Sequence, residues 1–106
     1  MHARVITAQV HYEKLGEASR LYQEGLVPMA RRLSGFKGSL WLVDNHTGKS
    51  LILLFWESEA ELKAGEINEA FQQQFGQVAS SFVSTPTRET YRVEVQPELE
   101  ERQIVD

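Results

Sequence analysis

Hydrophobic and polar residues along the first part of the chain alternate with a period of two. Residues 3–12 are rich in β-branched side chains and divide into an even and an odd row, a pattern typical of a β-strand. From Leu15 to Leu33 the apolar residues recur at steps of three and four, which predicts an amphipathic helix. Pro28 has no amide hydrogen to donate within a helix and Gly25 lies just before it, so we expect an interruption there.

Two short apolar runs, residues 39–44 and 50–57, flank the polar segment NHTGK. This segment contains Gly48, which tolerates a positive φ, so the two runs are predicted to form an antiparallel hairpin. Apolar and polar residues alternate again over residues 87–95, which predicts a last strand with one wetter face.

A second helix is predicted between the hairpin and the last strand. Ser58 followed by Glu61 is an S-x-x-E capping box, in which each side chain accepts a hydrogen bond from a backbone N–H, so the helix should begin at Glu59. Apolar residues continue at helical spacing to Phe82, and Gly65 is expected to bend the helix on the way.

The predicted order of elements is β-α-β-β-α-β, which is typical of the ferredoxin-like α+β fold. In that fold one antiparallel sheet carries both helices on a single face. A length of 106 residues suits one domain. We therefore predict a single domain at residues 1–96, followed by an acidic tail at residues 97–106.

The strand at residues 50–57 is apolar on both faces, although two helices can cover only one face of the sheet. Leaving a large apolar side chain in water forfeits about 1.5–3 kcal/mol of burial. A second copy of the chain would cover the bare face through a two-fold axis. The sequence thus predicts a homodimer whose interface contains Ile6, Ala8, Val10, Leu51, Leu53 and Phe55.

Composition narrows the classes of function. The chain has no cysteine, which excludes disulfides, thiolate nucleophiles and cysteine metal sites. A formal net charge of −4 disfavours binding to nucleic acid or to an anionic membrane. The three histidines are scattered along the chain, which argues against a metal site. The apolar runs are too short to span a membrane and no secretory signal is recognisable, so a cytoplasmic location is expected.

Several segments together resemble a known family. The stretch GFKGSLWLVDNHTGKSLILLFWESEAEL, with VPMARRLSGF before it and ETYRVEV after it, is similar to the antibiotic biosynthesis monooxygenase group of dimeric α/β-barrel proteins. The resemblance covers about residues 3 to 95. It implies a dimeric barrel and a small aromatic or quinone-like ligand. The group contains cofactor-free oxygenases of phenolic compounds, haem-degrading oxygenases, small-molecule isomerases and proteins with no assigned reaction.

The positions that carry chemistry in this family match only in part. The Asn, Trp and His of the haem-degrading members correspond to Thr7, Ala64 and Phe75, which argues against haem cleavage. In the quinone-forming branch Trp56 matches, whereas the Asn and Tyr of that site correspond to Ile52 and Leu62.

The resemblance places a ligand pocket between the helices and the sheet, on the Trp56 side of its strand and on the Thr7 side of the first strand. We predict His11 as the base and Trp56 as a second catalytic residue, with no cofactor. The predicted ligand-binding residues are Thr7, Gln9, Tyr22, Arg31 and Arg32. Each has a structural alternative: the aromatic residues can be core packing, the arginines can serve the helix dipole, and the strand residues can bond to loops.

Two functions follow from these observations. The leading hypothesis is a cofactor-free monooxygenase that oxidises a phenolic or quinol-type substrate. The alternative is a ligand-binding or structural dimer without catalysis, which the missing family residues favour. RNA-binding modules share the predicted strand order, but the strand at residues 50–57 offers Leu, Ile and Leu where such modules need exposed aromatic residues flanked by basic ones, and the net charge is negative.

Overall fold

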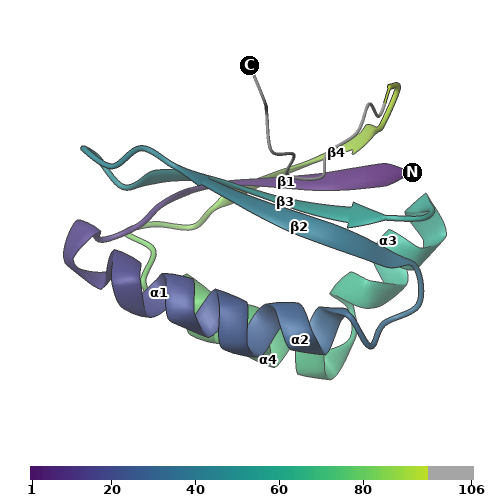
Figure 1. Ribbon diagram of the computed structural model, residues 1–106, viewed down its shortest axis with the longest axis horizontal. Helices are drawn as coiled ribbons and strands as arrows, with labels where there is room; N and C mark the ends of the chain where they lie inside the picture. The colour runs from purple at the N-terminus through teal and green to yellow at the C-terminus, as the bar shows by residue number, and fades with distance from the viewer. Residues whose placement is uncertain (96–106) are drawn as a thin grey trace, which may run out of the picture.

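The computed structural model describes residues 1–95. The predicted acidic tail at residues 97–106 lies outside the described residues. Figure 1 shows four strands and a set of helical segments. The elements are β1 (His2–Gln9), a 3-10 turn (Tyr12–Lys14), α1 (Leu15–Leu21), a π-helical segment (Tyr22–Leu26), α2 (Val27–Ala30), β2 (Phe36–Val43), β3 (Lys49–Trp56), α3 (Glu59–Glu66), α4 (Glu69–Ala79) and β4 (Thr87–Arg92).

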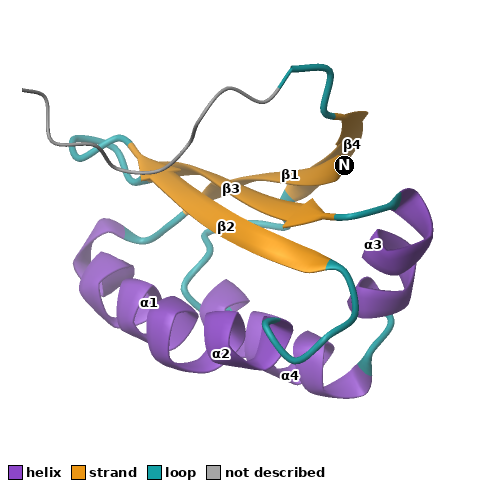
Figure 2. Ribbon diagram, turned by 45° about the vertical axis from the view of Figure 1, so that its right-hand side comes forward, coloured by secondary structure: helices purple, strands orange, loops and turns teal. Residues whose placement is uncertain are grey.

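The strands form one four-stranded sheet in the order β2-β3-β1-β4, and all neighbouring pairs are antiparallel. The helices lie on one face of this sheet, as Figures 1 and 2 show from two directions. This arrangement confirms the predicted ferredoxin-like α+β fold. None of the helices within residues 1–95 is long and apolar enough to cross a membrane.

The first helical region is interrupted where the sequence predicted it. The N–H of Val27 donates to the carbonyl oxygen of Tyr22, which is the wider spacing of a π-helix. Pro28 follows as the second residue of α2 and has no N–H to donate, so a regular helix would lack one backbone hydrogen bond at this point. The wide turn therefore lets the chain pass through Gly25 and Pro28 without ending the helical layer.

The second helical region is divided into α3 and α4, and the break falls just after the predicted bend at Gly65. Ser58 caps α3 by accepting a hydrogen bond from the Glu61 N–H at 3.2 Å, which confirms the predicted helix start. Asn68 caps α4 in the same way, accepting from the N–H of Phe71 at 3.0 Å. A second N-cap is therefore the local reason for the break.

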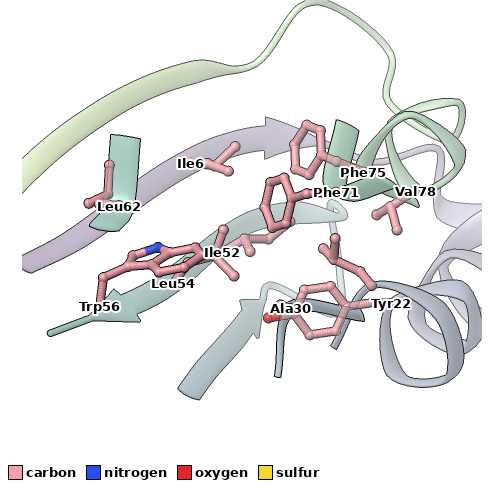
Figure 3. Close-up of a cluster of buried hydrophobic side chains, with 11 residues drawn as sticks. Ile6, Tyr22, Ala30, Ile52, Leu54, Trp56, Leu62, Phe71, Phe75 and Val78 are labelled. Carbon is pink, nitrogen blue, oxygen red and sulfur yellow. The ribbon is translucent and has the colours of Figure 1, made fainter. Parts of the chain in front are cut away.

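The core lies between the helices and the facing row of the sheet (Figure 3). Ile6 of β1 pairs with Ile52 of β3, so the two residues share this face. Leu54 and Trp56 extend the row along β3, and both are almost completely buried. Against them pack Tyr22, Leu26, Ala30, Leu62, Phe71, Phe75 and Val78.

The predicted face of the first strand was wrong. Ile6, Ala8 and Val10 are exposed by only 2%, 4% and 1%, because they lie under the helices and not on the bare face. Thr7 is paired with Leu51, so the odd row of β1 shares the bare face. The pairing register decides the face, and it places the two rows opposite to the prediction.

The bare face is nonetheless apolar, as predicted from β3. Leu51, Leu53 and Phe55 are half-buried there, next to Val5 of β1. The neighbouring strands add Leu40, Leu42 and Tyr91, which are exposed by 44%, 50% and 51%. Within residues 1–95 no helix lies over this side of the sheet (Figure 1), so these large apolar side chains are left uncovered.

Candidate functional site

A pocket of about 210 Å³ lies between α4 and the strands β1 and β4. We call it the Arg88 pocket. It is lined by Ile6, Glu66, Phe71, Gln72, Phe75, Gly76 and Arg88. The pocket is on the helix-covered face of the sheet, the side on which a ligand site was predicted.

Apolar side chains form the inner wall of the Arg88 pocket. The rings of Phe71 and Phe75 are stacked, with centroids 6.4 Å apart and an angle of 7° between their planes. They project from α4 at helical spacing, and Ile6 faces them from β1 (Figure 3). Such a wall suits the flat face of an aromatic ring.

Arg88 supplies a positive charge at this wall. It is paired with Ile6 across β1 and β4, so both side chains point toward the helices. Its guanidinium carbon lies 5.2 Å from the centre of the Phe75 ring. Within residues 1–95, Arg88 makes no ion pair, so its charge is left for another anion.

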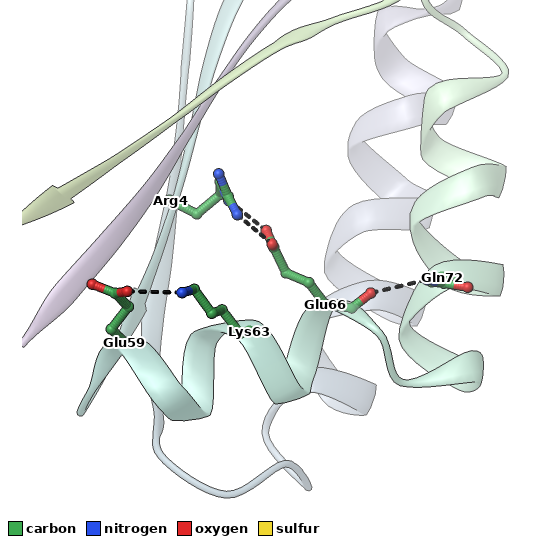
Figure 4. A network of polar contacts seen from close by, with 5 residues as sticks. All are labelled: Arg4, Glu59, Lys63, Glu66 and Gln72. Carbon is green, nitrogen blue, oxygen red and sulfur yellow. Dashed lines mark hydrogen bonds and ion pairs between the residues drawn. The ribbon is translucent and has the colours of Figure 1, made fainter.

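The other charged groups at the pocket neutralise each other (Figure 4). Arg4 of β1 donates to both carboxylate oxygens of Glu66, with two contacts of 2.5 Å. The two side chains are exposed by 17% and 20%, so the pair is shielded from water. Gln72 donates to the backbone carbonyl of Glu66 at 3.2 Å and ties α4 to the end of α3. Because Arg4, just outside the lining, holds the Glu66 carboxylate, Arg88 is the one charged lining residue without an ion pair within residues 1–95.

Trp56, predicted as catalytic, is buried completely and does not line the Arg88 pocket. Its ring meets Phe36 and Phe71 edge to face, with centroids 5.2 Å and 6.4 Å away. Gly65 of α3 lies so close that a Cβ atom there would be 2.2 Å from the indole ring. The structure therefore places Trp56 in the middle of the core.

The predicted polar row of β1 does not reach the pocket. Thr7 is paired with Leu51 and Thr87 on the bare face, which contradicts its predicted place beside the helices. Gln9, on the same row, donates to the backbone carbonyl of Thr47 in the hairpin loop. This hydrogen bond to a loop is the contact that the alternative interpretation of the strand residues describes.

The remaining candidates lie elsewhere. His11 follows β1, where its half-exposed side chain is 3.7 Å from the carboxylate of Glu13. Arg31 and Arg32 are exposed just beyond α2. Tyr22 is buried beside Trp41 in a different pocket.

Arg88, the cationic group of the site, was not predicted from the sequence. Arg88 lies in the last strand, which shows no motif and whose pairing register is not readable from its own residues. Arg4 gave a weak signal, because a charged residue within an apolar strand needs a partner when it is buried. The partner Glu66 is far along the chain, and the two meet only after α3 has packed on β1.

Metal-ligating side chains are not gathered at this site. In the part of the chain that the structure describes, no three His, Asp or Glu side chains come together as metal ligands. Two of the positions that correspond to the haem-degrading site, Thr7 and Ala64, lie on the bare face and on an exposed helix surface. The third, Phe75, lines the pocket but has no atom that can bind iron.

Comparison with solved structures identifies the fold. SnoaB of Streptomyces nogalater, a cofactor-independent oxygenase, is 14% identical, with a TM-score of 0.75 over 92% of this chain and 97% of that one. The ActVA-Orf6 monooxygenase of Streptomyces coelicolor, solved with nanaomycin D, is 16% identical, with a TM-score of 0.73 over 92% of each chain. A further antibiotic biosynthesis monooxygenase is 18% identical, with a TM-score of 0.72 over 88% and 98% of the two chains.

The chain therefore has the fold of the antibiotic biosynthesis monooxygenases, and the predicted resemblance is confirmed at that level. No family model matches the sequence, and no curated protein matches it. The fold alone does not assign a substrate or a reaction.

Proposed function

We propose that this protein binds a small aromatic anion in the Arg88 pocket. The observation that carries the proposal is the position of Arg88, whose guanidinium lies against an aromatic wall with no ion pair in the described chain. A ring bearing a phenolate or carboxylate would stack on the Phe71 and Phe75 side and pair with Arg88. The volume of about 210 Å³ is below the range of ~300–1,000 Å³ common for ligand pockets, which favours one or two rings.

A cofactor-free oxidation of a phenol fits this pocket. The phenol supplies all four electrons that dioxygen needs: one oxygen atom enters the ring to give a quinone, and the other leaves as water. Arg88 would stabilise the phenolate that donates the first electron, and the apolar wall would exclude water from the anion. The cofactor-independent oxygenase among the solved structures of this fold supports the proposal.

The test begins with binding. Titration with 1-naphthoate, which is always anionic at neutral pH, should saturate the protein, and Arg88→Met should weaken binding by about 10-fold or more, since a charge-assisted contact is worth ~1.5–3 kcal/mol. Arg20→Met is the matched control, because Arg20 is exposed on α1 and pairs with Glu24. If Arg88→Met and Arg20→Met bound 1-naphthoate with equal affinity, the assignment of a binding site to the Arg88 pocket would be wrong.

Catalysis is measured separately with 1-naphthol in an oxygen electrode. Oxygen uptake matched by quinone formation, and lost in Arg88→Met, would establish the monooxygenase. If the protein bound 1-naphthol without oxygen uptake, the result would favour the alternative interpretation, a non-catalytic ligand-binding protein.

We also propose that two copies pack through the bare sheet face. The face is apolar along β2 and β3, and a second copy is the simplest partner that covers it. Leu53→Lys should convert a particle of twice 12.1 kDa into one of 12.1 kDa in light scattering. Ile67→Lys is the control, since Ile67 is 77% exposed away from this face. A monomeric wild-type protein would contradict the proposal.

A further inference from the structure

A second pocket, of about 720 Å³, lies on the opposite flank of the helical layer, between β2 and the helical region that begins with α1. We call it the Trp41 pocket. Its wall includes apolar residues of the helical region, namely Leu15 and Val27. Its polar lining residues include Tyr22, Ser39 and Trp41.

These three side chains hold buried polar atoms that have no hydrogen-bond partner. They are the Tyr22 hydroxyl, the Ser39 hydroxyl and the Trp41 indole N–H, and all three stay unpaired within residues 1–95. A buried donor or acceptor without a partner costs about 1–3 kcal/mol, so proteins seldom leave several in one place. Their convergence on one pocket indicates a surface built to meet polar atoms from outside the chain.

Local structure holds the two aromatic side chains in place. Tyr22 begins the π-helical segment, and such segments occur often at functional sites. Its ring meets that of Trp41 edge to face, with centroids 5.2 Å apart and planes at 70°. Trp41 pairs with Ile52 across β2 and β3, so it faces the helices. Only 6% of Tyr22 is exposed, so its ring is fixed by packing.

The chemistry of this pocket differs from that of the Arg88 pocket. No Asp, Glu, Lys, Arg or His is among its lining residues. Burial raises the pKa of the Tyr22 hydroxyl well above its usual value, so the phenol stays protonated and can donate. The Trp41 N–H is a donor only, and the Ser39 hydroxyl can donate or accept.

We propose that the Trp41 pocket is a second binding site, which takes an uncharged, flat molecule whose carbonyl or ring oxygens accept hydrogen bonds from Trp41 and Tyr22. An anion is disfavoured, because the lining offers no positive charge to repay its loss of water. A purely apolar ring is disfavoured as well, because it would leave the three polar atoms unpaired. The site does not depend on the function proposed for the Arg88 pocket.

Coumarin is a suitable probe, since it is neutral and flat, and its lactone has a carbonyl oxygen and a ring oxygen on the same carbon. The chain has two tryptophans, so an ¹H–¹⁵N spectrum contains two indole N–H signals, assigned with Trp41→Phe. Coumarin should shift the Trp41 indole signal to lower field and leave that of the buried Trp56 in place. Trp41→Phe and Tyr22→Phe should each weaken coumarin binding by about 2- to 10-fold, the value of one neutral hydrogen bond.

Controls separate this site from the first one. Tyr91→Phe is the matched control for Tyr22→Phe, because the Tyr91 hydroxyl bonds to Glu89 on an exposed strand. Arg88→Met should not change coumarin affinity. Naphthalene, with the same ring frame and no oxygen, should bind at least several-fold more weakly. An unmoved Trp41 signal at saturating coumarin, or equal binding of naphthalene and coumarin, would overturn the proposal.

Discussion

Gly65→Ala should destabilise the protein even though alanine favours helices. Gly65 is buried in α3, and a Cβ atom there would lie 2.2, 2.7 and 2.9 Å from three atoms of the six-membered ring of Trp56. These separations are far below van der Waals contact. The indole has no room to retreat, since Trp56 is completely buried and is flanked by Phe36 and Phe71.

The sign follows from two opposing free energies. Replacing glycine by alanine in a helix gains up to about 1 kcal/mol. Overpacking a rigid core usually costs about 1–3 kcal/mol, and the closeness of this contact puts the cost in the upper part of that range. The net loss should therefore be about 1–2 kcal/mol, or a fall in Tm of roughly 4–15 °C for a domain of this size.

Thermal unfolding followed by circular dichroism measures this loss. Gly76→Ala is the matched control, because a Cβ atom at Gly76 in α4 would have no neighbouring atom within 4 Å, and this change should raise Tm slightly. In a Trp56→Phe background the outer indole ring is gone, so the Gly65→Ala penalty should disappear. A Gly65→Ala protein as stable as Gly76→Ala would refute the reasoning.

Three further outcomes are expected from the same structure. Asn68→Ala removes the cap of α4 and should lower the free energy of unfolding by about 1 kcal/mol in a urea titration. Arg4→Met leaves the shielded Glu66 carboxylate without its partner and should cost about 1–3 kcal/mol, whereas a double change of both residues to Met should recover part of that loss. Burial raises the pKa of Tyr22 in the folded state, so its stabilising contribution is complete below the unfolded pKa of about 10 and declines as the pH rises further. The difference in Tm between the wild type and Tyr22→Phe should therefore change with pH only in the alkaline range.

The element order was predictable because each element carries its own local signal. Ser58 and Glu61 mark the start of α3, and Gly48, with φ near 80°, marks the hairpin turn. The face of β1 was not predictable from that strand alone. Both of its rows contain β-branched side chains, and Arg4 in the core row suggests a solvent-facing position until Glu66 is known to meet it. The row of β1 that faces the core is set by the pairing of this strand with β3, which is distant in sequence.

The candidate sites were harder to predict for the same reason. Tyr22 was predicted to bind a ligand, and it does line a pocket, but Trp41 and Ser39 were not among the predicted site residues. Their buried polar atoms have no hydrogen-bond partner within residues 1–95, and all three residues line the same pocket, which is a property of the assembled structure. Arg88 likewise becomes notable only because the register of β4 turns it toward Phe75.

The packing of the core explains why the two pockets lie on its flanks. Ile52 and Leu62, at positions where the quinone-forming branch was expected to carry polar residues, are apolar and almost completely buried. Together with Trp56 they fill the space between β3 and the helices (Figure 3). A ligand therefore has no room at the centre of this layer. The polar groups available to a ligand come instead from the two edge strands, Arg88 from β4 and Trp41 from β2. Ligand binding and any reaction should therefore depend on these edge residues more than on Trp56.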